Sequence, residues 1–245
     1  MSDRDPGGIS RRRLLGSAAA LAGAALAPGL FLVQAHPDGG ADAGARWGLL
    51  VDTNRCRRDC RACVDACREE NGWPAADNAG GDIHWIRKVD LQPAEADGPG
   101  HSAPVMCQHC AEPPCVSVCP TRASFRRADG IVLVDKHRCI GCRYCMVACP
   151  FHARAFVHAP VDERSPNHPR GKGTVESCTL CVHRIDRGEA PACVARCAEA
   201  GHAALVFGDL NDPDSEIRHA LRERSAEALR PDLALDAGVR YHGLS

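Results

Sequence analysis

The sequence predicts an α+β protein that is rich in loops and whose centre is filled by cysteine-bound clusters instead of large side chains. Aromatic residues make up 4% of the 245 residues, too few for a large aromatic core, so something else must fill the centre. The 16 cysteines are the candidates, and they fall into four groups of four with none left over. The groups are Cys56, Cys60, Cys63 and Cys67; Cys107, Cys110, Cys115 and Cys119; Cys139, Cys142, Cys145 and Cys149; and Cys178, Cys181, Cys193 and Cys197.

The third group has the clearest signature. Residues 139–150 read C-I-G-C-R-Y-C-M-V-A-C-P, which fits the C-x2-C-x2-C-x3-C-P run of bacterial [4Fe-4S] ferredoxins. Three thiolates so close in sequence can surround one corner of a compact cluster only if the chain coils tightly, and Gly141 gives the backbone that freedom. We expect Cys149 to begin a short helical turn and to reach the other cluster of a pair, with Pro150 ending the turn.

The other three groups are variants of this run. In residues 107–120 the spacing is C-x2-C-x4-C-x3-C-P, because Pro113 and Pro114 enlarge the loop before the third cysteine. Residues 56–67 read C-x3-C-x2-C-x3-C and lack the final proline. In residues 178–197 an insertion of eleven residues separates the second cysteine from the third. Two runs that face each other make two clusters, so four runs predict four [4Fe-4S] clusters.

Disulfides and zinc are the alternatives to these clusters. Cysteines two residues apart, repeated along the chain, cannot pair locally without strain, which argues against disulfides. Structural zinc takes two C-x2-C pairs separated by a longer segment, and only residues 178–197 resemble that pattern. Each group already offers four thiolates, so we expect His109, His137 and His152 to be loop or packing residues.

Composition and motifs exclude several functions. The formal net charge is -1, from 30 basic and 31 acidic residues, so no overall field favours nucleic acid. The sequence contains no G-x-G-x-x-G, P-loop, H-E-x-x-H or C-x-x-C-H motif, so nothing indicates a nucleotide site or a c-type haem. The arginines around the first group are expected to balance the negative charge of a thiolate-bound cluster. They are Arg55, Arg57, Arg58 and Arg61.

Residues 1–35 have the pattern of a twin-arginine export signal. The sequence S-R-R-R-L-L at residues 10–15 leads into an Ala/Gly-rich apolar run that extends to Val33, and a small-residue site ends at Ala35. A membrane anchor is the alternative, since the run nearly reaches spanning length, although its glycines and a proline weaken that interpretation. The twin-arginine route carries folded proteins, so clusters assembled in the cytoplasm could reach the periplasm intact.

The remaining sequence predicts short elements around the cysteines. We expect a flexible linker over residues 36–46, strands over 47–51, 83–89 and 203–207, a hairpin over 124–134 that turns at Asp129–Gly130, irregular chain over 158–173, and a helix over 215–229. The residues before this helix, Asp212, Pro213 and Asp214, are typical of a helix start.

The motifs together resemble the four-cluster electron-transfer subunits of membrane respiratory complexes. The second group reads C-x-x-C-x-x-P-P-C-x-x-x-C-P-T and the third C-I-G-C-R-Y-C-M-x-A-C-P. Within that class the chain is most similar to DsrO, the periplasmic iron–sulfur subunit of the membrane complex associated with dissimilatory sulfite reductase. The closer likeness lies in residues 56–67, 173–197, 205–217 and 239–244, and it departs from the class at Ala198, where proline is usual.

The resemblance implies two interleaved ferredoxin-like halves, each with two clusters. Residues 47–100 and 170–210 would form the outer half, 101–169 an inserted half, and 211–245 a C-terminal helix and tail. Each fourth cysteine would serve the opposite cluster. The implied ligand sets are Cys107, Cys110, Cys115 and Cys149; Cys139, Cys142, Cys145 and Cys119; Cys56, Cys60, Cys63 and Cys197; and Cys178, Cys181, Cys193 and Cys67.

The same resemblance implies a relay of single electrons with no catalytic residue of its own. The expected partners are a polytopic quinone-reactive membrane subunit and a multihaem cytochrome c. The alternative is a molybdopterin catalytic subunit that reduces a sulfur or nitrogen oxyanion or a sulfoxide. A substrate-converting enzyme would need an open metal position or a nucleophile–base pair, and a structural or sensing iron–sulfur protein would hold clusters that cannot be cycled.

Overall fold

The computed structural model describes residues 41–73, 83–91, 100–158 and 171–244. The chain divides into two units, Met1–Asp38 and Gly39–Ser245, and everything described below belongs to the second. The expected export signal lies outside the described residues, as do residues 36–40 of the linker and most of the segment expected to be irregular. None of the helices in the described part of the chain is both long and apolar enough to cross a membrane.

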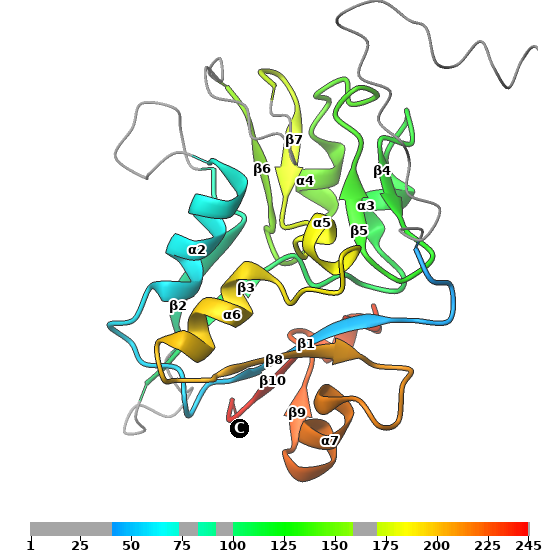
Figure 1. Cartoon of the computed structure of the whole chain (residues 1–245). Helices are drawn as coiled ribbons and strands as arrows, with labels where there is room; N and C mark the ends of the chain where they lie inside the picture. Colours follow the sequence, from blue (N-terminus) through cyan, green and yellow to red (C-terminus); the bar gives the residue numbers. More distant parts are fainter. Residues whose placement is uncertain (1–40, 74–82, 92–99, 159–170, 245) are drawn as a thin grey trace, which may run out of the picture. The chain divides into compact units, whose positions relative to one another are not determined.

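A four-stranded sheet joins the start of the described chain to its end (Figure 1). Its order is β8 (Leu205–Asp209), β1 (Trp47–Asp52), β10 (Val239–His242) and β9 (Ala226–Glu227). Strand β1 pairs antiparallel with β8 and parallel with β10, and β10 pairs antiparallel with β9. Leu49, Leu50 and Val51 are buried, as expected of a central strand that is covered on both faces.

Three antiparallel hairpins connect the cysteine-bearing loops. They pair β2 (Ile86–Leu91) with β3 (His101–Met106), β4 (Ser124–Arg126) with β5 (Val132–Val134), and β6 (Arg154–Phe156) with β7 (Val175–Ser177). Cys107 follows β3 directly and Cys178 follows β7 directly. The pairing of these strands therefore fixes the positions of the two cysteines at the start of their loops.

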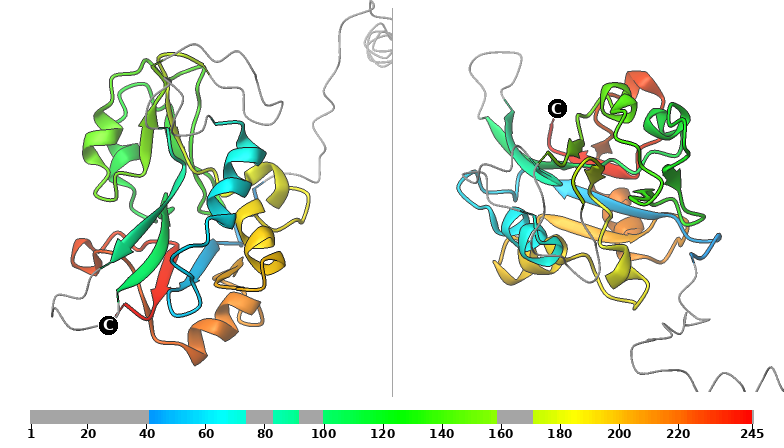
Figure 2. Two further views of the ribbon diagram at one scale, coloured as in Figure 1. Left: turned by 90° about the vertical axis from the view of Figure 1, so that its left-hand side faces the viewer. Right: turned by 90° about the horizontal axis from the view of Figure 1, so that it is seen from above.

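The helices fall into two packed pairs and three separate elements. Helix α2 (Ala62–Asn71) lies beside α6 (Ala192–Glu199), as the views in Figures 1 and 2 agree. The short helices α3 (Pro114–Ser117) and α4 (Tyr144–Ala148) form the second pair. The others are α5 (Val182–Ile185), α7 (Glu216–Glu223) and the 3-10 turn η2 (Pro231–Leu233).

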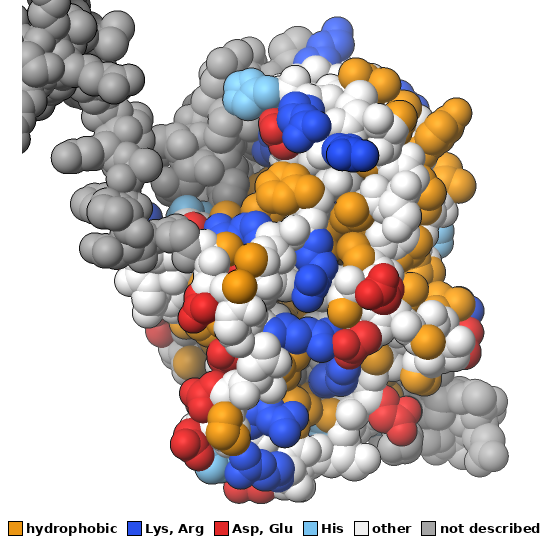
Figure 3. Space-filling view, turned by 90° about the vertical axis from the view of Figure 1, so that its right-hand side faces the viewer, with side chains coloured by type: hydrophobic (Ala, Val, Ile, Leu, Met, Phe, Trp, Pro, Cys, Tyr) orange, Lys and Arg blue, Asp and Glu red, His pale blue; other side chains and the backbone are white. Residues whose placement is uncertain are grey.

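Charged side chains of both signs are distributed over the surface. On the face shown in Figure 3, Lys and Arg side chains lie among acidic and hydrophobic ones. This mixture on one face agrees with the formal net charge of -1, which gives no overall attraction to nucleic acid.

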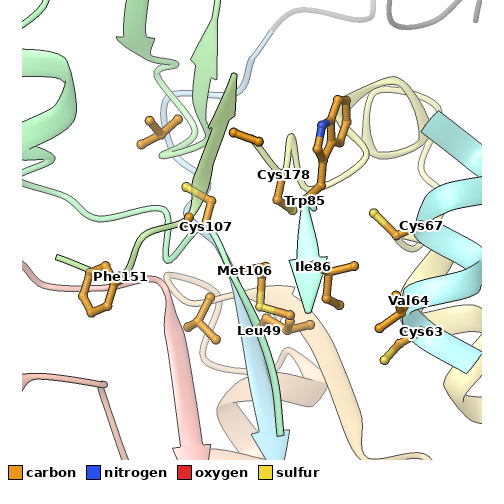
Figure 4. Packing of buried hydrophobic residues seen from close by; sticks show 14 of the residues in the cluster. Leu49, Cys63, Val64, Cys67, Trp85, Ile86, Met106, Cys107, Phe151 and Cys178 are labelled. Atoms are coloured by element: carbon orange, nitrogen blue, oxygen red, sulfur yellow. The ribbon is translucent and has the colours of Figure 1, made fainter. Parts of the chain in front are cut away.

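The centre of this unit is built largely from thiols. Its main cluster of buried apolar residues includes nine cysteines, with Trp73, Trp85, Phe151 and Tyr241 as its buried aromatic side chains. In Figure 4, Leu49, Ile86 and Met106 lie between Cys107 and helix α2. The described chain is thus a loop-rich α+β structure in which cysteines occupy positions that large hydrophobic side chains fill elsewhere.

Several expected elements are confirmed with shifted boundaries. The strand expected at 47–51 is β1, the strand expected at 83–89 is β2, and the hairpin at 124–134 consists of β4 and β5. The strand expected at 203–207 begins two residues later, at Leu205, and follows Ala203, whose φ is 43°.

Three expectations are wrong. The helix expected at 215–229 ends at Glu223, because the chain turns into β9 to pair with β10. Cys149 does not begin a helical turn, since α4 ends just before it and Cys149 is extended. The end of the expected flexible linker is held in place, because the Arg46 guanidinium donates to Asp236 Oδ2 at 2.6 Å.

Candidate cluster sites

Cys56, Cys60, Cys63 and Cys197 line one cavity, which we call the Cys56 site. Cys56 and Cys60 lie in the loop after β1, Cys63 lies in α2, and Cys197 lies in α6. The packing of α2 against α6 therefore brings together thiols that are far apart in the sequence.

Lys88 on β2 supplies the positive charge at this site. Its Nζ donates to Cys56 Sγ at 3.3 Å and to the carbonyl oxygens of Arg57 and Cys60. Burial raises the pKa of Cys56, and the Lys88 charge partly offsets that rise. Burial, followed by the charges of other thiolates at the site, raises the pKa of Cys63 to about 12.

A second cavity, the Cys178 site, is lined by Cys67, Cys178, Cys181 and Cys193. Figure 4 shows Cys67 projecting from α2 toward β2, where Trp85 and Ile86 lie. The same two residues and Met106 form the apolar wall of the cavity. Asn71 Nδ2 donates to Cys67 Sγ at 3.6 Å, and Leu180 N donates to Cys178 Sγ at 3.4 Å. In the described residues no Lys or Arg donates to a sulfur of this site.

The Cys139 site is a third cavity, lined by Cys119, Cys139, Cys142 and Cys145. Gly141 has φ of 70°, and a Cβ there would overlap the carbonyl oxygen of Gly173, so glycine is required both by conformation and by space. This confirms the role expected of Gly141. The backbone N of Ser124 donates to Cys119 Sγ at 3.4 Å. Cys142 is the exposed member of the chain's 16 cysteines.

The remaining four cysteines, Cys107, Cys110, Cys115 and Cys149, form the Cys107 site. Helix α3, which contains Cys115, packs on α4, which ends just before Cys149. Burial raises the pKa of Cys110 to about 12, and the charges of Cys115 and Cys149 add to that rise. The same two thiolates raise the pKa of Cys107, where burial is again the largest cause. The structure therefore groups Cys149 with residues of the second cysteine group.

Arg154 serves this last site in the way that Lys88 serves the first. Its Nη2 donates to Cys115 Sγ at 3.1 Å and its Nη1 donates to Ser124 Oγ at 2.7 Å. Burial raises the pKa of Cys115, while the charge of Arg154 lowers it. Neither Arg154 nor Lys88 stands out in the sequence, because each is separated by more than 30 residues from the cysteine that it contacts.

Each site has a neighbouring site whose thiolates affect its own. Besides burial, the thiolate of Cys145 raises the pKa of Cys115, which places the Cys139 site beside the Cys107 site. Burial and then the charge of Cys107 raise the pKa of Cys178, which joins the Cys107 and Cys178 sites. Cys193 lies close enough to Cys63 for that thiolate to add to the burial-raised pKa of Cys193. The order is the Cys139, Cys107, Cys178 and Cys56 sites.

The donor sets fit [4Fe-4S] clusters. All 16 cysteines are free of disulfides, and four thiols per site is the ligand set of such a cluster. Within the described ranges no three His, Cys, Asp or Glu side chains converge to hold a single metal ion. Backbone N–H groups and cations that donate to sulfur stabilise thiolate-bound clusters, and each of the four sites has such a donor.

The structure also shows the contacts of two of the arginines near the first cysteine group and of His109. Arg57 pairs with Asp59 and Arg58 with Asp90 at the surface, so these two arginines balance carboxylates, and Lys88 contacts the cysteine instead. His109 is buried, and its Nδ1 accepts a hydrogen bond from Val132 N at 3.1 Å. Burial lowers the pKa of His109 to about 3, so it is a neutral packing residue.

Comparison with known proteins agrees with the binding of [4Fe-4S] clusters. The family model of the 4Fe-4S dicluster domain matches residues 101–209. The chain is 42% identical over 262 residues to the Hdr-like menaquinol oxidoreductase iron-sulfur subunit 1 of Archaeoglobus fulgidus, covering 95% of this chain and 97% of that relative. The chain belongs to this family of [4Fe-4S] electron-transfer subunits.

Further relatives lie in other respiratory enzymes. The chain is 35% identical to a tetrathionate reductase subunit of Salmonella typhimurium, over 81% of this chain and 73% of the relative. It is 32% identical to the menaquinone reductase iron-sulfur cluster-binding subunit of Nitratidesulfovibrio vulgaris, over 80% of this chain and 88% of the relative. As a member of this family, the chain is a redox subunit that binds [4Fe-4S] clusters and transfers electrons.

Proposed function

We propose that each of the four sites holds one [4Fe-4S] cluster and that the clusters form a single relay, ordered as the Cys139, Cys107, Cys178 and Cys56 sites. Each cluster, when bound, accepts and releases one electron at a time. The observation that supports this proposal most directly is that cysteines from different groups line common cavities, which the packing of α2 on α6 and of α3 on α4 brings close together. The protein's own contribution is to hold the sites in sequence, exclude water from most of them and set their charge environments.

The ligand sets of this proposal make two interleaved halves. The Cys107 and Cys139 sites would form the inserted half, and the Cys178 and Cys56 sites the outer half. Support comes from the helix pairs, since α3 packs on α4 and α2 packs on α6. Strands β6 and β7, which pair with each other, would link the inserted half to the returning outer half.

The partner proposed is a polytopic quinone-reactive membrane subunit, with a multihaem cytochrome c in the same complex and a role in dissimilatory sulfur metabolism. Two of the relatives are named for menaquinol or menaquinone, which supports the quinone-reactive partner. The alternative is a molybdopterin catalytic subunit acting on an oxyanion, and the relative in tetrathionate reductase supports it. In either case the twin-arginine pattern of residues 1–35 supports a periplasmic location.

The quinone-reactive subunit would contact the Cys139 end of the relay. Cys142 is exposed there, and the same loop and helix present Ile140, Tyr144 and Val147 with 67%, 62% and 86% of their surface exposed. Apolar side chains this exposed beside an exposed ligand are typical of an interaction surface.

Redox titration of the purified full chain, followed by electron paramagnetic resonance (EPR), tests the relay. We expect four clusters that reduce and reoxidise reversibly, and fewer than four would contradict the proposal. Cys197→Ser tests the interleaving: it should change the spectrum of the cluster that also responds to Cys56→Ser, and a change in the cluster that responds to Cys193→Ser instead would refute the ligand sets. Gentle purification from membranes should recover a quinone-reactive subunit, whereas a molybdenum-containing subunit would favour the alternative.

A further inference from the structure

Arg154 is a buried cation whose partners lie at two different cluster sites. It is the first residue of strand β6, and 6% of its surface is exposed. Its Nη2 donates to Cys115 Sγ, which belongs to the Cys107 site. Its Nη1 donates to Ser124 Oγ, and the backbone N of the same serine donates to Cys119 Sγ of the Cys139 site. One guanidinium thus links sulfur atoms of both sites.

No carboxylate among the described residues forms an ion pair with Arg154. A buried ion without a counter-charge is unfavourable by several kcal/mol, so the negative charge that Arg154 needs must come from the thiolates around it. The geometry agrees, since Arg154 Nη2 lies 3.1 Å from Cys115 Sγ at one site, and Nη1 lies 2.7 Å from the hydroxyl of Ser124, whose backbone N donates to Cys119 Sγ at the other. Its charge therefore acts on both sites.

We propose that Arg154 is a shared positioning residue that raises the reduction potentials of both inserted clusters together. Reduction of either cluster adds one negative charge beside the guanidinium, and a fixed positive charge stabilises that state. The fork of the guanidinium suits this role, because its two terminal nitrogens are held apart in one rigid plane and reach Cys115 and Ser124 at once, whereas the donors of a lysine ammonium share one nitrogen. The inference rests on the ligand sets proposed above. It identifies the residue whose charge acts on both inserted clusters.

The other two sites provide an internal comparison. The Cys56 site has its own cation, Lys88, on a different strand. At the Cys178 site, sulfur hydrogen bonds come from Asn71 and from backbone N–H, and no cation in the described chain donates to its sulfurs. Removing Arg154 should therefore change two clusters of the four and leave the outer pair unchanged.

The test is an EPR-monitored redox titration of the full-length, cluster-loaded protein with Arg154→Met and Arg154→Gln. Each variant should lower the equilibrium constant for reduction of both inserted clusters at least tenfold. This corresponds to a shift of at least 59 mV toward more negative reduction potential for a one-electron couple. Arg154→Lys keeps the charge and should shift them less. Ligand variants assign the signals, with Cys110→Ser marking the Cys107 cluster and Cys142→Ser marking the Cys139 cluster. Lys88→Met is the matched control and should move the Cys56 cluster alone.

The number of clusters whose potentials shift decides whether Arg154 acts on both inserted sites. A shift of one inserted cluster would show that Arg154 serves a single site and would overturn the shared role. Unchanged potentials, or equal shifts of all four clusters, would also overturn it. Arg154→Gln keeps a polar side chain at this buried position, so it provides a second neutral variant if the methionine variant fails to assemble. Failure of the wild-type protein to show four clusters would instead refute the proposed function, which separates the two.

Discussion

Replacing Lys88 by methionine should lower the reduction potential of one cluster and leave the other three unchanged. The Lys88 Nζ lies 3.3 Å from Cys56 Sγ and donates to the carbonyl oxygens of Arg57 and Cys60 at 2.5 and 3.1 Å. Methionine has a similar length and no charge, so the substitution removes the electrostatic interaction with little change in volume.

The size of the effect follows from the geometry. The charge added on reduction lies about 6 Å from Nζ, if a metal–sulfur bond of about 2.3 Å extends the nitrogen–sulfur distance. At that separation two unit charges interact by about 0.7 kcal/mol in water and about 3 kcal/mol at an effective dielectric constant of 20. These energies correspond to about 30 and 120 mV for a one-electron couple. Because Lys88 is partly exposed, we expect a shift in the lower half of this range, toward more negative potential.

Redox titration of the full-length protein monitored by EPR measures this shift, and Arg87→Met on the same strand is the control. The guanidinium of Arg87 donates to the carbonyl oxygens of Phe151 and His152 instead of to a sulfur. Its removal tests whether loss of any cation from β2 changes the potentials. A shift to more positive potential in Lys88→Met, or an equal shift in both variants, would refute the electrostatic account.

Three further predictions follow from individual residues. Gly141→Ala should cost the protein the Cys139 cluster, measured as a loss of about a quarter of the bound iron, because its positive φ and the nearby Gly173 carbonyl exclude a Cβ. Ile217→Ala should lower the free energy of unfolding by about 2–5 kcal/mol in denaturant titrations, with all four EPR signals retained, because Ile217 is buried against Leu50 away from the cysteines. Val147→Asp should change stability by less than about 0.5 kcal/mol and yet weaken association with membranes, since Val147 is exposed at the proposed contact end.

The sequence predicts the parts of each site that depend on local spacing. The C-x2-C loops need tight turns, so the cysteines and Gly141 are recognisable from the sequence alone. The strand at Trp47 and the hairpin at Asp129–Gly130 are equally local, since a short apolar run indicates the first and turn chemistry the second.

Nonlocal features could not be predicted in the same way. Lys88 and Arg154 gain their role only when β2 and β6 bring them to sulfur atoms 32 and 39 residues away along the chain. The parallel pairing of β1 with β10 joins the two ends of the described chain, and it also explains why the expected C-terminal helix is short. Once β10 occupies the sheet, residues 226–227 gain more from pairing as β9 than from continuing α7.

The C-x3-C spacing that ends the first and fourth cysteine groups explains how the Cys56 and Cys178 sites become neighbours. In α2, Cys63 lines the Cys56 site and Cys67 lines the Cys178 site, and in α6 Cys193 and Cys197 line the same two sites. Residues four apart lie on one face of a helix and about 6 Å apart along its axis. Each of these helices therefore presents one thiol to each of two adjoining cavities. Because α2 packs against α6, the two helices together provide half of the thiols of both sites, and this fixes the distance between neighbouring clusters by helix geometry instead of by flexible loops.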